Sequence, residues 1–161
     1  MFVDFEKLPK TSKIWIYQSD RKFYPNEIEG LENKLKGFLS SWNDNGIDII
    51  ASYQLKYDRF IILAVDETID AITVNAIDDS VRFILQLQFD YEIELLDKLN
   101  VCFKQGEFVQ YKEVKEFKKL IKSKSISAKA IVFNNLINTK GELASDWEIP
   151  ITESWHNRFL K

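Results

Sequence analysis

Residues 46–65 read GIDIIASYQLKYDRFIILAV and hold the densest apolar material in the chain. Alternate residues from Ile47 to Tyr57 are apolar, which predicts a strand with one buried face. The segment Phe60–Val65 is apolar on both faces, as a central strand is. Asp58 and Arg59 lie at the bend, where no glycine sets the turn type. The stretch therefore predicts two antiparallel strands at the centre of a sheet.

Strand and helix patterns alternate on the N-terminal side of this pair. Residues 13–17 alternate like a buried strand, and apolar residues recur at helical spacing over residues 25–44. Pro25 suits the first turn of that helix, and Asn26 and Glu29 have the spacing of a capping pair.

On the C-terminal side, a helix is predicted to open at Asp78 or Asp79 and to run to about residue 90. Its apolar positions are Val81, Ile84 and Leu85, with Phe89 near its end. Further elements follow in the order of a strand over 101–111 with a bulge at Gly106, a helix over 112–123, a short strand over 130–133, and a packed tail.

The element order β-α-β-β-α-β matches the ferredoxin-like split βαβ arrangement. We therefore expect an α+β fold with an antiparallel or mixed sheet, helices on one face, and a C-terminal αβ extension. A length of 161 residues predicts a single domain over residues 1–161.

Composition narrows the function classes. The net charge of −3 gives no general attraction to nucleic acid or to an anionic membrane. Cys102 is the single cysteine, so an internal disulfide and a thiolate metal cluster are excluded. The first residues are acidic where a signal peptide would be basic, and no apolar run is long enough to span a bilayer. We expect a cytoplasmic protein without a membrane partner.

Polar residues near the 78–90 helix are the first candidate site. Ser80 and Arg82 at a helix N-terminus could hold a phosphate or carboxylate, although Asp78 and Asp79 would repel an anion there. The candidate anion or ligand site comprises Arg59, Asp78, Ser80, Arg82, Lys104 and His156.

His156, the only histidine, is a possible general acid or base near neutral pH. No G-x-S-x-G motif accompanies it, and Cys102 lies in an apolar strand where an inert thiol is usual. No catalytic residue can therefore be assigned.

Metal and nucleotide motifs are missing. The acidic residues Asp66, Glu67, Asp70, Asp78 and Asp79 lack the spacing of an EF-hand. Neither G-x-x-x-x-G-K-[ST] nor G-x-G-x-x-G occurs, so P-loop ATP hydrolysis is excluded. We expect no metal and no cofactor.

The 112–124 segment has six lysines and two glutamates. Lysines opposite an apolar stripe usually form a solvated face. A nucleic-acid surface would also need arginines and exposed aromatic residues, and the acidic total charge argues against one.

Several stretches resemble a family of small bacterial proteins that are often labelled "ABC transporter ATPase". The resemblance covers nearly the whole chain and lies in residues 5–9, 14–18, 56–60, 77–84, 103–108, 131–136 and 154–156. It implies one compact domain, and it supplies no catalytic residue.

The leading expectation is a non-catalytic interaction or small-ligand-binding domain, with a protein partner or a second copy in a homodimer. The alternative is an enzyme that acts on a small anionic substrate near the start of the 78–90 helix. Nucleic-acid binding through the 112–124 lysine helix is third.

Overall fold

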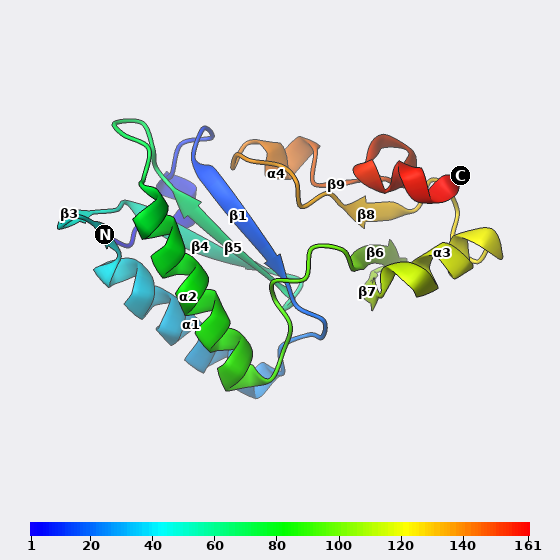
Figure 1. Cartoon of the computed structure of the whole chain (residues 1–161), viewed down its shortest axis with the longest axis horizontal. Helices are drawn as coiled ribbons and strands as arrows, with labels where there is room; N and C mark the ends of the chain where they lie inside the picture. Colours follow the sequence, from blue (N-terminus) through cyan, green and yellow to red (C-terminus); the bar gives the residue numbers. More distant parts are fainter. The chain divides into compact units, whose positions relative to one another are not determined.

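The computed structural model describes all 161 residues, Met1–Lys161. Its helices and antiparallel sheets confirm the predicted α+β class (Figure 1). By their internal contacts the residues form two compact units, unit 1 (Met1–Leu96 with Asn138–Gly141) and unit 2 (Asp97–Ile137 with Glu142–Lys161). The single domain expected from chain length stays a prediction.

Unit 1 contains a three-stranded sheet in the order β1-β5-β4, with both strand pairs antiparallel. The strands are β1 (Lys13–Gln18), β4 (Ala51–Lys56) and β5 (Phe60–Val65). All six residues of the central strand β5 are buried, as its apolar sequence predicts. Tyr57 and Asp58 turn the chain between β4 and β5 with φ of 55° and 49°, and the Arg59 N–H donates to Lys56 O at 3.0 Å. Positive φ at both central residues is the geometry of a type I′ turn, formed here without glycine.

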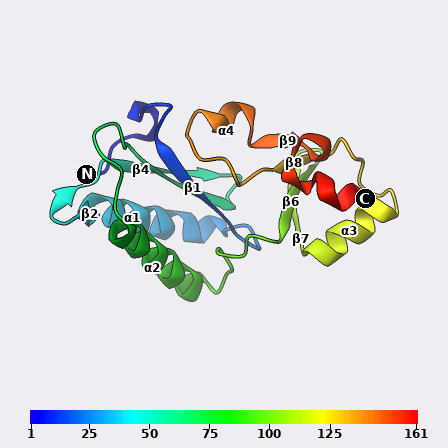
Figure 2. The same cartoon turned by 45° about the horizontal axis from the view of Figure 1, so that its top comes forward.

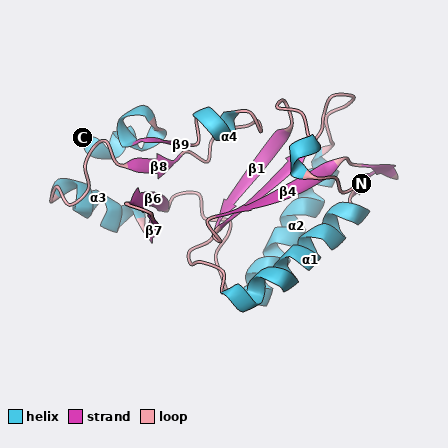
Figure 3. Cartoon of the chain, turned by 180° about the vertical axis from the view of Figure 1, so that it is seen from behind, coloured by secondary structure: helices cyan, strands magenta, loops and turns pink.

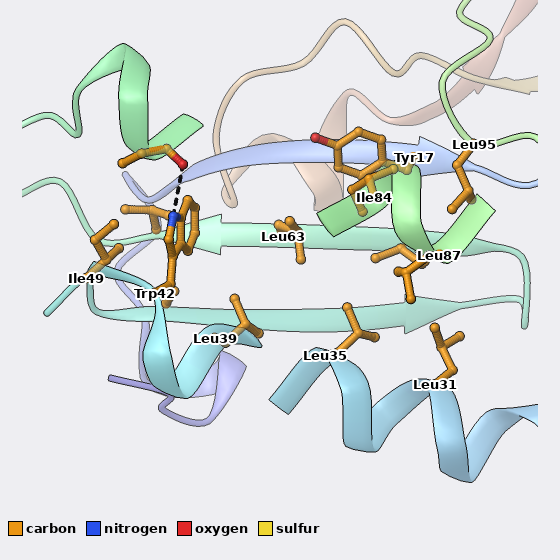
Figure 4. Packing of buried hydrophobic residues seen from close by; sticks show 14 of the residues in the cluster. Tyr17, Leu31, Leu35, Leu39, Trp42, Ile49, Leu63, Ile84, Leu87 and Leu95 are labelled. Atoms are coloured by element: carbon orange, nitrogen blue, oxygen red, sulfur yellow. Dashed lines mark hydrogen bonds between the residues drawn. The ribbon is translucent and has the colours of Figure 1, made fainter. Parts of the chain in front are cut away.

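Helices α1 (Pro25–Ser41) and α2 (Val74–Tyr91) lie side by side on one face of this sheet, as predicted (Figures 1 and 3). Figure 4 shows side chains of both helices pointing at the sheet. The core side chains drawn there include Leu31, Leu35, Leu39, Leu63, Ile84 and Leu87. The Trp42 indole Nε1 donates to Ala76 O at 2.9 Å, which ties the end of α1 to the first turn of α2.

The ends of α1 differ from the prediction. Glu27 Oε1 accepts the Tyr24 N–H at 2.7 Å, so this residue closes the N-terminus rather than the predicted pair Asn26 and Glu29. The helix ends at Ser41 because the chain enters a short hairpin of β2 (Asn43–Asp44) and β3 (Ile47–Asp48). The predicted strand from Ile47 to Tyr57 is consequently interrupted before β4.

The predicted start of α2 at Asp78 or Asp79 is wrong. The helix begins at Val74, and Thr73 is its N-cap, with Thr73 Oγ1 accepting from the Ala76 N–H at 3.4 Å. Asp44 fixes this cap, because its carboxylate accepts from Thr73 N at 2.8 Å and from Thr73 Oγ1 at 2.7 Å. An aspartate on the distant hairpin thus sets where α2 starts.

The ferredoxin-like core is not confirmed. The order β1-β5-β4 is that of a split βαβ unit, but β6 (Val101–Gln105) belongs to another sheet. The edge of β1 that a fourth strand would use is partly covered by residues 138–140. There the Ile14 N–H donates to Asn138 O, and the Lys140 N–H donates to Ser12 O, both at 2.9 Å.

Unit 2 contains a four-stranded antiparallel sheet in the order β7-β6-β8-β9. Its elements are β6, β7 (Phe108–Lys112), α3 (Val114–Lys122), β8 (Ile131–Phe133), α4 (Glu142–Ser145) and β9 (Glu148–Pro150). Three short 3-10 helices complete the chain: η1 (Phe5–Lys7) in unit 1, and η2 (Ile151–Glu153) and η3 (Trp155–Leu160) in unit 2. Gly106, with φ of 61°, forms the turn between β6 and β7, so the predicted bulge is wrong.

Candidate functional site

Ser80 and Arg82 lie on opposite sides of α2. Residues two apart on an α-helix point about 200° away from each other. Ser80 is accordingly buried, and its Oγ donates to Ile77 O at 2.6 Å, whereas Arg82 is exposed and forms an ion pair with Asp79. Because α2 begins at Val74, neither residue lies at a helix N-terminus, and the predicted anion cradle is wrong in this respect.

Arg59 is buried at the end of the β4–β5 turn. Its Nη1 donates to Ser19 O at 3.0 Å, and the Ser19 N–H donates back to Arg59 O at 3.0 Å. The Nε atom is buried without a hydrogen-bond partner. These contacts hold the β4–β5 turn against the segment after β1. Arg59 therefore has a structural role that requires no ligand.

Lys104 and His156 belong to unit 2. Lys104 on β6 forms an ion pair with Glu148 on β9. The four predicted residues of unit 1 are likewise divided among the turn at Arg59, the buried side of α2 and its exposed side. Within each unit, the structure therefore does not gather the predicted residues around one point.

His156 forms a close pair with Ser154. The two atoms Ser154 Oγ and His156 Nδ1 are 2.6 Å apart, and both residues are buried. Ser154 Oγ also accepts the His156 N–H at 3.4 Å as the cap of η3, so its hydroxyl hydrogen can donate to Nδ1. Burial, and secondly the charge of Arg158, lowers the pKa of His156 to about 4. The ring is therefore a weak base at neutral pH, and the pair resembles a helix cap more than a catalytic dyad.

The acidic connection after β5 bonds to its own backbone. Asp66 Oδ1 accepts from Thr68 N at 2.9 Å, and Glu67 Oε2 accepts from Ile72 N at 2.8 Å. No group of three or more His, Cys, Asp or Glu side chains is arranged to hold a metal ion. These carboxylates shape the loop that leads into α2.

A second apolar stripe runs along the exposed side of α2, and we call it the α2 stripe. It consists of Val74, Leu85 and Phe89, which are 71%, 47% and 79% exposed, with the half-buried Ile77 and Val81 between them. Of the apolar positions predicted for this helix, only Ile84 is fully buried, and Leu85 and Phe89 are exposed. The helical angle of 100° per residue places the stripe beside the buried face of the helix.

The charges along α2 are largely paired within the chain. Arg82 pairs with Asp79, and Asp90 accepts from Lys34 Nζ at 3.1 Å and from Gln86 Nε2 at 2.8 Å. Asp78 is exposed and makes no ion pair or side-chain hydrogen bond. An unpaired carboxylate thus borders the α2 stripe.

A signal for the α2 stripe was present in the sequence. A helix that begins at Val74 has more apolar positions than one buried face can use. The helix predicted from the sequence starts only at residue 78 and therefore omits Val74 and Ile77. Without these two residues the excess of apolar positions is not visible in the pattern.

A comparison of the chain with protein-family models, with curated proteins and with solved structures found no match. None of the helices combines the length and apolar composition that crossing a bilayer requires.

Proposed function

We propose that this chain is a non-catalytic interaction domain that self-associates through the α2 stripe. The observation that carries the proposal is the exposure of Val74, Leu85 and Phe89 along one side of a helix whose other side is buried. Single exposed apolar residues are common on protein surfaces, but a row of them along one element is typical of an interaction site.

An antiparallel pair of α2 helices, one from each copy, would bury the exposed apolar residues of the α2 stripe. A two-fold axis near Val81 would place Val81 against its own copy and Leu85 against Ile77 of the second copy. The same axis would place Phe89 against Val74. Every exposed apolar residue of the stripe then meets another one, as an isologous interface requires.

The charges beside the stripe are self-complementary in this arrangement. Asp78 and Arg82 are one helical turn apart on the same flank. In an antiparallel pair related by a two-fold axis, equivalent flanks face each other, so Asp78 of one copy lies near Arg82 of the other. Two symmetric ion pairs result, and the unpaired Asp78 gains a partner. Arg82, now bound to Asp79, is exposed enough to exchange.

The expected affinity is modest. The exposed fractions of Val74, Leu85 and Phe89 add up to about two complete side chains in each copy. Burying them yields about 3–6 kcal/mol per copy at roughly 1.5–3 kcal/mol for each side chain. Association itself costs about 4–15 kcal/mol. We expect a dimer with a dissociation constant in the micromolar to millimolar range.

Sedimentation equilibrium over a wide concentration range, with charge-exchange variants, tests the proposal. Asp78→Arg and Arg82→Asp should each weaken the dimer by roughly 2- to 30-fold, because each loses two surface ion pairs worth about 0.2–1 kcal/mol apiece. The double variant should restore the dimer. A wild-type chain that remains monomeric at millimolar concentration refutes self-association, and additive losses in the double variant refute the antiparallel arrangement.

A further inference from the structure

Four lysines form one stripe on α3. Lys115, Lys118, Lys119 and Lys122 follow the spacing i, i+3, i+4, i+7, which places them on a single side of the helix. All four are exposed. The helical rise of about 1.5 Å per residue spreads them over about 10 Å. This length is comparable to a few nucleotides of a phosphate backbone.

The apolar side of α3 is already occupied. Phe117 is completely buried, and its ring lies 5.4 Å from that of Phe103 in the core of unit 2. Basic amphipathic helices that bind membranes insert their apolar face among the lipids. Helix α3 cannot do so without opening the core, so its lysines fit a water-exposed anionic polymer better than a lipid surface.

Aromatic residues and an arginine of η3 lie beside the lysine stripe. Helices α3 and η3 are neighbours in Figures 1 and 2, and the Lys118 Nζ lies 5.3 Å from the centre of the Phe159 ring. The Arg158 guanidinium lies 5.0 Å from the Trp155 ring centre and 5.3 Å from that of Phe159. Both aromatic residues are half-buried, and Arg158 beside them is exposed. These residues lie more than thirty positions after α3 in the sequence.

The rings are held in place by the packing beneath them. Trp155 stacks on His156 with 3.9 Å between ring centres, and the Phe117 ring is 6.1 Å from that of Phe159. His156 is neutral at physiological pH, because burial lowers its pKa to about 4. The aromatic platform is thus ordered before any ligand arrives.

The charge of unit 2 favours an anionic ligand. Its residues include 11 lysines and arginines against 8 aspartates and glutamates, a net charge of +3, although the whole chain has a net charge of −3. The two acidic residues at this helix are Glu113, which is its N-cap, and Glu116. The Glu116 carboxylate lies 3.8 Å from the Lys112 ammonium group. The overall acidity that argued against nucleic acid therefore belongs to unit 1.

We propose that unit 2 binds single-stranded nucleic acid on this face. Lysines 115, 118, 119 and 122 would neutralise successive phosphates, and bases would stack on the exposed face of the flat Arg158 guanidinium, which lies over the Trp155 and Phe159 rings. A duplex hides the faces of its bases, so stacking favours a single strand. This inference is independent of the proposed dimer, which uses α2 of unit 1.

Fluorescence anisotropy of the full chain with labelled oligo(dT), oligo(U), and a duplex of equal length tests the proposal. With four lysines neutralising phosphates, the logarithm of affinity should fall with the logarithm of salt concentration with a slope of about −2.8. Lys119→Ala should reduce that slope by about 0.7, whereas Lys36→Ala, an exposed lysine on α1 of unit 1, should leave it unchanged.

Stacking has its own readout. Arg158→Ala and Trp155→Ala should each weaken binding to a single strand by roughly 5- to 100-fold, and Trp155→Phe should retain most of it. Arg158 is exposed, so its variant tests the idea even if Trp155→Ala fails to fold. Absence of binding at low salt overturns the proposal. Equal binding of the duplex or of heparin, unaffected by Arg158→Ala, also overturns it and leaves only a general attraction to polyanions.

Discussion

Phe89→Gln is the most direct perturbation of the α2 stripe. Phe89 is 79% exposed, so the folded monomer gains little from its ring. Glutamine is a better helix former than phenylalanine, and exposed substitutions usually change stability by less than about 0.5 kcal/mol. The monomer should therefore keep its fold, and any effect should appear in self-association.

The size of that effect follows from the exposed fraction. Burying a complete phenylalanine side chain yields about 1.5–3 kcal/mol. With 79% of the residue exposed in each copy, a symmetric dimer would lose about 2.4–4.7 kcal/mol when both rings are removed. This loss corresponds to a dissociation constant raised roughly 50- to 3,000-fold.

Sedimentation equilibrium measures the dissociation constant directly, and Phe108→Gln is the matched control. Phe108 on β7 of unit 2 is 73% exposed, so it presents a similar apolar area outside the α2 stripe. Self-association through the α2 stripe is refuted if Phe89→Gln dimerises as well as the wild-type chain, or if Phe108→Gln is the variant that dissociates. A thermal denaturation scan of both variants confirms that the monomers are folded.

Three further predictions concern stability. His156 has a pKa of about 4 in the folded chain and about 6.5 when unfolded, so the unfolded state binds the proton first as the pH falls. Stability should therefore fall by about 3 kcal/mol between pH 6.5 and 4, and urea denaturation of His156→Gln should lack this component. Leu35→Ala, at a completely buried position, should reduce the free energy of unfolding by about 2–5 kcal/mol. The control Lys36→Ala, on the exposed side of α1, should change the free energy of unfolding little. Equal effects of the two variants would contradict the packing of α1. Thr73→Ala should lower the free energy of unfolding by about 0.5–2 kcal/mol, because the helix cap is lost. Adding Asp44→Ala should lower it little further, because both changes break the same hydrogen bonds. Additive losses in a double-mutant cycle would contradict this coupling.

The sequence determined those elements whose pattern is local. Apolar periodicity identified α1, β5 and α3, and the α+β class followed from the order of these segments. Lysine spacing alone also placed four basic side chains on one side of α3. Such patterns can be recognised in the sequence because the side chains of a helix or strand return to the same side every few residues.

Contacts between distant residues decided the rest. Asp44 set the start of α2, and residues 138–140 occupied the edge of β1 where a ferredoxin-like strand was expected. The packing of α2 on the sheet left Leu85 and Phe89 exposed, and only the fold brought Arg158 and Phe159 beside Lys118. The pairing of residues far apart in a chain depends on packing of the whole unit, which no local pattern encodes, and the proposed surface of unit 2 arises from such pairing.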